Sequence, residues 1–124
     1  NNCTILSLYR PPAASIPNFS DQMQDLILNL SNRTVLIVGD INIDLLRERA
    51  NETFFNMLYS YHFFPLITIA TRKTDNSATC IDQIWYNKLN ISLAGSSASD
   101  CSDHYPVFAL INTFKSNTSL LNFS

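Results

Sequence analysis

The sequence has few charged residues and no excess of basic ones. Of its 124 residues, 8 are Lys or Arg and 10 are Asp or Glu, which gives a formal net charge of −2. This balance provides no overall basic field to attract nucleic acid, so any binding to a phosphate backbone must be local. The adjacent pair Arg72-Lys73, in the polar loop Thr71 to Ser77, is one candidate for such a contact, and an ordinary solvated loop explains it equally well.

Long apolar runs and paired cysteines are also missing. No run approaches the roughly 20 apolar residues of a membrane helix, and the N-terminus has no basic segment followed by an apolar one, so we expect neither membrane insertion nor export. The three cysteines form no CxxC pair, which indicates neither a disulfide framework nor a zinc site and favours an intracellular location. Asn-x-Ser/Thr sequons would indicate glycosylation in a secreted protein, but we attribute them to chance in a chain rich in these residues. They begin at Asn2, Asn18, Asn29, Asn32, Asn51, Asn90, Asn117 and Asn122.

The composition indicates one folded unit. With 46% hydrophobic and 15% charged residues, the chain should form a core rather than remain disordered. Its length suits one domain but is short for an enzyme with a deep cleft, which makes a partial domain a serious alternative. We expect the fold to cover residues 1–115 and a polar tail to follow over residues 116–124.

Apolar spacing, breakers and caps predict the secondary structure. We expect strands over residues 3–9, 34–38, 64–69, 80–86 and 106–114, the second of them buried on both faces. One helix should be capped by Asn18 or Ser20 and end near residues 31–33, and another should cover residues 51–61. The residues expected to face the core from the helices are Phe19, Met23, Leu26, Ile27, Leu30, Phe54, Phe55, Leu58 and Tyr59.

Three short acidic signatures each place a carboxylate at the end of an apolar run. They are Gly39-Asp40-Ile41-Asn42, Ile81-Asp82-Gln83-Ile84 and Ser102-Asp103-His104. Magnesium prefers one or two carboxylates together with waters and substrate phosphate, so scattered single Asp residues suit it. The signatures therefore predict metal-assisted hydrolysis of a phosphodiester.

The spacing within these signatures suggests a division of roles. Asp40 and Asn42 would share a face of an extended segment, where a carboxylate can accept a proton and an amide can hydrogen-bond the reacting oxygen. Asp103 and His104 are adjacent, so their side chains would point in different directions and have separate roles. Asp82 is the natural carboxylate partner for His104. Each signature alone is explained by a turn, a buried group or a cap, but their combination in this order favours catalysis.

The order and spacing of several motifs resemble a known group of enzymes. The motifs are Tyr9-Arg10-Pro11-Pro12, Val38-Gly39-Asp40-Ile41-Asn42-Ile43-Asp44-Leu45, Thr71-Arg72, Thr79-Cys80-Ile81-Asp82 and Ser102-Asp103-His104-Tyr105-Pro106. From about Tyr9 to Leu110 the chain resembles the endonuclease/exonuclease/phosphatase superfamily, and within it the endonuclease domain of non-LTR (LINE-type, jockey- or CR1-like) retrotransposons. The resemblance implies a partial DNase I-like four-layer α/β sandwich whose N-terminal half is missing, from a magnesium-dependent endonuclease that nicks DNA to prime reverse transcription.

The resemblance also implies roles for individual residues. Tyr9 would contact the scissile phosphate, Asp40 would orient or deprotonate the attacking water, and Asn42 would stabilise the phosphoryl group. Asp82 would orient His104 on the phosphate.

Metal, DNA and partner roles follow from the same resemblance. Asp103 would bind Mg²⁺, for which Mn²⁺ can substitute, and Arg72 and Thr79 would contact DNA. The implied partners are DNA, an upstream half-domain and a downstream reverse transcriptase.

Some departures from the family pattern limit this interpretation. Pro12 stands where relatives such as the apurinic endonucleases carry Asn, and Gln83 stands where His or Tyr is more usual. The family's early Asn and metal-binding Glu lie before the region matched, and neither Glu48 nor Glu52 can replace that Glu because both follow Asp40. We therefore expect the chain alone to be inactive and marginally stable, and to expose apolar surface on the inner face of its sheet.

Two other functions fit the sequence less well. The chain could be a domesticated or decaying relic that acts, if at all, as a non-catalytic binding module, as the missing Glu and acidic charge suggest. A phosphatase of small phosphorylated substrates is the third alternative, and the Tyr-Arg-Pro-Pro motif argues against it.

Overall fold

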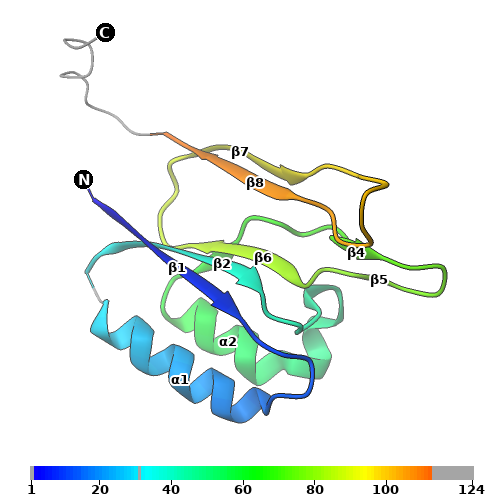
Figure 1. Cartoon of the computed structure of the whole chain (residues 1–124). Helices are drawn as coiled ribbons and strands as arrows, with labels where there is room; N and C mark the ends of the chain where they lie inside the picture. Colours follow the sequence, from blue (N-terminus) through cyan, green and yellow to red (C-terminus); the bar gives the residue numbers. More distant parts are fainter. Residues whose placement is uncertain (1, 31, 113–124) are drawn as a thin grey trace, which may run out of the picture.

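The computed structural model of the protein describes residues 2–30 and 32–112. The elements, in chain order, are β1 (Cys3–Tyr9), α1 (Ile16–Asn29), β2 (Thr34–Asp40), the 3-10 helix η1 (Leu45–Asn51), α2 (Glu52–Ser60), β3 (Phe64–Pro65), β4 (Arg72–Lys73), β5 (Ala78–Thr79), β6 (Asp82–Tyr86), β7 (Ile91–Ser96) and β8 (Val107–Ile111). Figure 1 shows α1 and α2 side by side on one face of the main sheet, with the β7–β8 ribbon beyond its other face. The predicted tail over residues 116–124 lies outside the described residues.

The main sheet has the strand order β1-β2-β6-β3. β1 and β2 run parallel and are joined through α1, whereas β6 pairs antiparallel with both β2 and β3. The register places Tyr9 beside Asp40 and Asp40 beside Asp82. Because directly paired residues of neighbouring strands share a face, three of the predicted site residues form one row at the end of this sheet.

The first helix begins earlier than the sequence predicts. Ser15, not Asn18 or Ser20, is the N-cap, and its side chain accepts a hydrogen bond from the backbone N–H of Asn18 at 3.2 Å. Pro17 fits into the first turn because its missing N–H would have no partner inside the helix. The helix ends at Asn29, before the predicted end, and Leu26 is exposed rather than facing the core.

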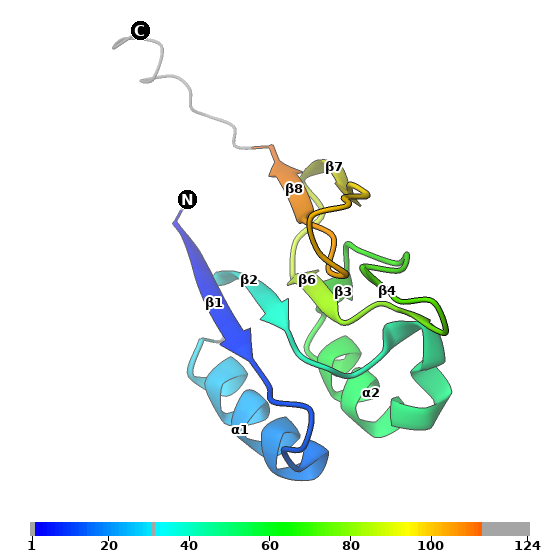
Figure 2. The same cartoon turned by 45° about the vertical axis from the view of Figure 1, so that its right-hand side comes forward.

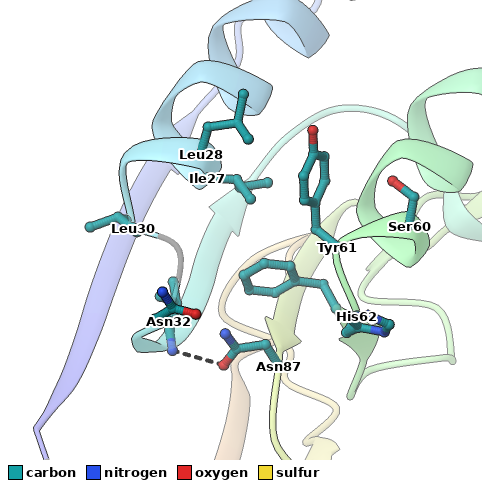
Figure 3. A pocket seen from close by; sticks show the side chains of 10 residues that line it. Ile27, Leu28, Leu30, Asn32, Ser60, Tyr61, His62 and Asn87 are labelled. Atoms are coloured by element: carbon teal, nitrogen blue, oxygen red, sulfur yellow. Dashed lines mark hydrogen bonds between the residues drawn. The ribbon is translucent and has the colours of Figure 1, made fainter.

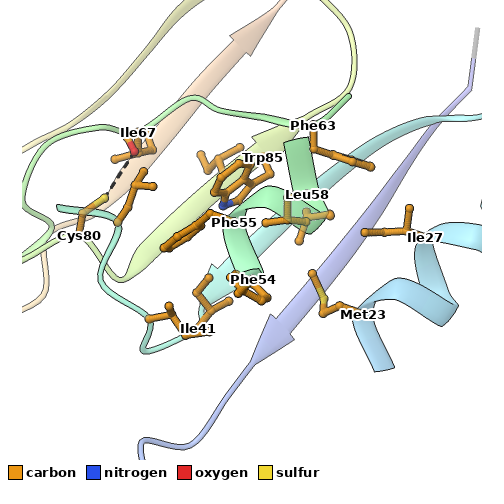
Figure 4. Packing of buried hydrophobic residues seen from close by; sticks show 14 of the residues in the cluster. Met23, Ile27, Ile41, Phe54, Phe55, Leu58, Phe63, Ile67, Cys80 and Trp85 are labelled. Carbon is orange, nitrogen blue, oxygen red and sulfur yellow. Dashed lines mark hydrogen bonds between the residues drawn. The ribbon is translucent and has the colours of Figure 1, made fainter. Parts of the chain in front are cut away.

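Aromatic side chains of α2 form the centre of the core. Phe54, Phe55 and Leu58 are buried, as predicted, and the ring of Phe55 stacks on that of Trp85 with centroids 5.8 Å apart. Figure 4 shows Met23 and Ile27 of α1, also buried, lying close to this aromatic group. The predicted inward face of α2 is therefore confirmed, including Tyr59, which is half-buried but packs against the core with its ring centroid 5.6 Å from that of Trp85.

Several strand predictions need correction. The predicted strand 64–69 is reduced to β3, after which the backbone N–H of Leu66 makes one more bond to β6, to the carbonyl of Ile84 at 2.8 Å. β6 begins at Asp82 rather than residue 80, and β8 covers Val107–Ile111 of the predicted 106–114, whose last residues lie outside the described part. The sequence did not predict β7, the short β4–β5 hairpin or η1.

The face of the main sheet opposite the helices is only partly covered. Val35 and Ile37 of β2 are buried toward the helices, whereas Leu36 and Val38 are half-buried, so the prediction of burial on both faces is wrong. Figure 2 shows the β7–β8 ribbon lying near β6 and away from β1. Ile5 of β1, which pairs with Leu36, is 63% exposed, as expected if a covering layer is missing.

Gln83 links the main sheet to the loop after β2. Its side chain is 1% exposed, and its Nε2 donates to the carbonyls of Ile43 at 2.7 Å and Cys80 at 2.8 Å. Its Oε1 accepts from the indole Nε1–H of Trp85 at 2.8 Å. The departure from the family pattern at this position is therefore a fully bonded amide of the core.

We expect Gln83→Leu to destabilise the fold by about 2–4 kcal/mol, because it leaves a buried indole N–H and two carbonyls without their partners. Urea unfolding followed by the fluorescence of Trp85, the single tryptophan, measures the change. The exposed Gln22→Leu is the matched control. Equal free energies of unfolding for the two variants would show that these hydrogen bonds contribute nothing.

Neither α1 nor α2, the α-helices in the described ranges, has the length and apolar character needed to span a membrane.

Candidate active site

The candidate site lies where β2 and β6 bring their acidic residues together. Asp40 ends β2, Asp82 begins β6, and the two residues are directly paired. His104 reaches the same place from the segment before β8. One ligand atom from each of these three residues lies within 4.8 Å of the others.

The pairing of Asp82 with His104 that the sequence indicated is present. Nδ1 of His104 lies 2.9 Å from Oδ2 and 3.2 Å from Oδ1 of Asp82. The hydroxyl of Thr71 donates to the same Oδ2 at 3.0 Å, and it accepts from the backbone N–H groups of Ile81 and Asp82. A carboxylate with this many partners holds one orientation and can fix the histidine ring.

The β4–β5 hairpin positions the segment that carries His104. Arg72 and His104 form an isolated antiparallel bridge. On either side of it, the N–H of Tyr105 donates to the carbonyl of Thr71 at 2.6 Å and the N–H of Lys73 donates to the carbonyl of Asp103 at 2.9 Å. These backbone bonds place the histidine ring beside Asp82 although the two residues lie far apart in the sequence.

Asn42 does not share an extended face with Asp40. The strand ends at Asp40, and Asn42 has a φ of 51°, in the left-handed region that Asn adopts more readily than most residues. Its backbone N–H donates to Oδ1 of Asp40 at 3.2 Å, and its side-chain Nδ2 donates to the carbonyl of Arg10 at 2.8 Å. The two residues are therefore joined by a tight turn rather than by strand periodicity.

The environment of Asp40 disfavours its ionised form. Burial raises the pKa of its carboxyl above the ordinary value of 3.8, and the neighbouring Asp82 charge raises it further. The charge of His104 and the Asn42 N–H partly offset these effects. A carboxyl with a raised pKa is a better proton acceptor than an ordinary aspartate.

We expect Asp40→Asn to stabilise the fold at pH 7 in the presence of EDTA. Because the folded-state pKa of Asp40 is raised, ionisation of this carboxyl removes stability as the pH rises above 3.8, and an amide at this position removes that contribution. The gain in thermal midpoint should shrink as the pH falls and vanish below that value. Thermal scans from pH 3 to pH 7 test this, with the exposed Asp25→Asn as control; a gain that is independent of pH would contradict it.

The remaining predicted site residues lie around this group. Tyr9 is next to Asp40 across the sheet and 64% exposed, so its ring is accessible. Nε of Arg72 donates to Oδ2 of Asp103 at 2.9 Å, and this hydrogen bond lowers the pKa of the Asp103 carboxyl. Asp103 is not one of the three clustered residues. Oγ1 of Thr79 is buried and has no hydrogen-bond partner within the described part of the chain.

Sequence reasoning assigned no role to three residues that support the site. Thr71 is fully buried beneath Asp82, and Arg10 is buried against residues 40–42. Oδ1 of Asp44 accepts from the N–H groups of Leu46 at 3.0 Å and Cys80 at 2.9 Å, which ties the loop after β2 to the segment between β5 and β6. All three lie inside motifs already noted, but only their burial and long-range contacts show what they do.

A pocket of about 300 Å³ lies at the other end of the main sheet. It is lined by residues from the C-terminal ends of α1 and α2 and from the start of β2, among them Ile27, Tyr61 and His62 (Figure 3). Val35, in its wall, is roughly 16 Å along β2 from Asp40. This pocket is therefore separate from the acidic group.

Comparison with known proteins supports the fold. No protein-family model matches the sequence, and neither does any curated protein. Solved structures do match, at low sequence identity. An endonuclease/exonuclease/phosphatase family protein from Leptotrichia buccalis superposes with a TM-score of 0.56 at 19% identity, covering 76% of this chain and 41% of that one.

Two further structures superpose more closely. The endonuclease domain of TRAS1, a telomere-specific non-LTR retrotransposon, gives a TM-score of 0.68 at 13% identity over 88% of this chain and 56% of that one. A conserved protein of unknown function from Enterococcus faecalis gives 0.66 at 18% identity over 87% and 49%. The chain thus spans about half the length of the structures it matches, and over that half it has the α/β sandwich fold of endonuclease/exonuclease/phosphatase proteins.

Proposed function

We propose that this chain carries the Asp and His half of the active site of a divalent-metal-dependent DNA endonuclease of the non-LTR retrotransposon type. The main support is the convergence of Asp40, Asp82 and His104 within 4.8 Å, with the Asp82–His104 pair fixed by Thr71. The similarity to the TRAS1 endonuclease domain supports the DNA substrate.

The residues of this chain have separate tasks in this proposal. Asp40 accepts the proton of the attacking water, and its raised pKa suits that task. His104, oriented by Asp82, donates a hydrogen bond to the scissile phosphate. Asn42 stabilises the phosphoryl oxygens, and the exposed Tyr9 contacts the phosphate beside Asp40.

The donor atoms at the site fit a hard divalent cation. Carboxylate oxygens are the ligands that Mg²⁺ prefers, and Asp82, beside the proton acceptor Asp40, would offer one to an ion that also meets substrate phosphate. When bound, the cation would lower the barrier by neutralising charge on the phosphoryl oxygens. We also propose Asp103 as a ligand, in which case its carboxylate serves both the cation and Arg72.

Contacts with DNA are proposed for the β4–β5 hairpin. Arg72 and Thr79 are paired across it, and Lys73 is exposed beside them. The side chain of Arg72 is 39% exposed even while it pairs with Asp103, so its guanidinium can also meet a DNA phosphate. Because the net charge of the chain is −2, this hairpin is the local basic contact that the proposal needs.

Activity in this proposal requires the rest of the sandwich, which we term the complementary half. In the complete domain, this chain would be joined to the complementary half from the same coding sequence, and a reverse transcriptase would follow it. The uncovered face with Ile5, Leu36 and Val38 supports the need for a covering layer.

We expect the complete domain to nick supercoiled plasmid in Mg²⁺ and this chain alone to nick no faster than its own His104→Ala variant. Gel quantification of relaxed plasmid, with equal molar protein, measures both rates. An excess over the variant by the chain alone would show that half of the sandwich suffices. A complete domain without activity would overturn the proposed function.

A second candidate is a non-catalytic module that binds a partner through an exposed apolar surface. Exposed apolar side chains on the outer face of the β7–β8 ribbon favour it, since Leu93, Phe108 and Leu110 lie together there. The intact Asp40, Asp82 and His104 group favours the enzyme instead.

A further inference from the structure

Arg10 is a buried cation at the turn between β1 and α1. The sequence presents it as part of a chain-breaking Arg-Pro-Pro run, yet the structure leaves it only 3% exposed. Buried arginines normally face a carboxylate. Within residues 2–30 and 32–112, Arg10 forms no salt bridge, and backbone carbonyls accept from its guanidinium.

The contacts of Arg10 converge on the segment that carries the site. Its Nε donates to the carbonyl of Ile41 and its Nη2 to that of Asn42, both at 2.8 Å, while Nη1 donates to the carbonyl of Ala14. Its backbone N–H donates to the carbonyl of Asp40 at 3.0 Å, and its own carbonyl accepts from Nδ2 of Asn42 at 2.8 Å. One residue thus makes contact with Asp40, Ile41 and Asn42 in turn.

The conformation of this segment needs such support. Asn42 lies in the left-handed region, which disfavours most side chains, and the turn keeps its N–H on the Asp40 carboxylate. A planar guanidinium can reach Ala14 on one side and the two carbonyls on the other at the same time. A lysine ammonium is a compact point charge and cannot span that set of acceptors.

We propose that Arg10 is a positioning residue that fixes Asp40 and Asn42 toward the reacting phosphate, an inference that rests on the proposed function. Arg10 touches no reacting atom. It acts by holding the backbone of residues 40–42, so its loss moves both side chains together.

The test uses Arg10→Lys and Arg10→Met in the complete domain, with the exposed Arg33→Lys and Arg33→Met as controls. We expect Arg10→Lys to lower kcat for plasmid nicking about 100-fold, because small displacements of reacting groups have effects of this size, while KM stays within about threefold. In ¹⁵N NMR spectra the side-chain amide signals of Asn42 should shift in both Arg10 variants and stay in place in the controls.

An Arg10→Lys protein with kcat within about twofold of the unaltered protein, or with its loss confined to KM, would overturn the proposal. If both variants fail to fold, hydrogen exchange in the unaltered protein provides the test. The Nε–H of Arg10 should exchange slowly with solvent, and rapid exchange would refute its hydrogen bond to Ile41. If the unaltered domain does not nick DNA, the proposed function fails, whereas the Asn42 and Arg10 signals still show whether Arg10 holds the segment.

Discussion

Replacing His104 by alanine in the complete domain should lower the rate of plasmid nicking by about 1,000-fold, within the range expected for loss of a proton-transfer or hydrogen-bonding group. The ring is held 2.9 Å from Asp82 and only its other nitrogen remains to meet a phosphate. The side chain is also partly exposed, so its removal should leave unfolding by urea nearly unchanged. Rates come from single-turnover conversion of supercoiled plasmid.

His62, the other histidine, provides the matched control. It lies beside the pocket at the far end of the main sheet and has a φ of 66°, so asparagine, which tolerates that conformation, is the suitable replacement. His62→Asn should nick at the rate of the unaltered protein. A folded His104→Ala protein that also keeps the full rate would remove His104 from the mechanism.

Gly39→Ala should destabilise the protein by at least about 3 kcal/mol and leave it largely unfolded, since marginal stability cannot absorb a loss of that size. Gly39 has a φ of 147°, and a Cβ there would lie 1.8 Å from the backbone carbonyl oxygen of Leu8. The obstacle is backbone of the paired strand β1, which can move only if the β1–β2 pairing opens. Urea unfolding followed by Trp85 fluorescence measures the loss.

The second glycine of the chain makes this prediction specific. At Gly95 a Cβ would meet only the end of the Phe108 ring, at 3.4 Å, which is close to an ordinary contact. Gly95→Ala should therefore change the free energy of unfolding by less than about 1 kcal/mol. If the two variants unfold at the same urea concentration, the close approach of Leu8 to Gly39 is not a constraint on the fold.

Local signals in the sequence predicted the elements that form the main sheet and its helices. The strand before Arg10-Pro11, the β-branched run from Thr34 and the aromatic face of α2 all follow from side-chain spacing. The cap of α1 lies at Ser15, before the predicted Asn18 or Ser20, because Pro17 occupies the first turn, where a missing N–H has no cost. The β4–β5 hairpin has strands too short to show any periodicity.

Only part of the candidate site could be predicted in the same way. The sequence predicts Asp40, Asp82 and Asp103 from their places at the ends of apolar runs, and His104 as the partner of Asp82. The structure brings Asp40, Asp82 and His104 together and leaves Asp103 outside that group. The turn at Asn42 could not be predicted, because it depends on hydrogen bonds with Arg10, a residue distant in sequence. The burial of Thr71 beneath Asp82 likewise depends on pairing across the hairpin and has no local signal.

Conversion of supercoiled to relaxed plasmid by the complete domain, with Mg²⁺ and again after EDTA, tests most directly whether the Asp40, Asp82 and His104 group hydrolyses phosphodiesters. We expect protein-dependent nicking that stops on chelation, resumes when Mg²⁺ is restored in excess, and is lost in Asp82→Asn. Nicking that continues in EDTA, or the same rate with Asp82→Asn, would contradict a metal-dependent site at these residues.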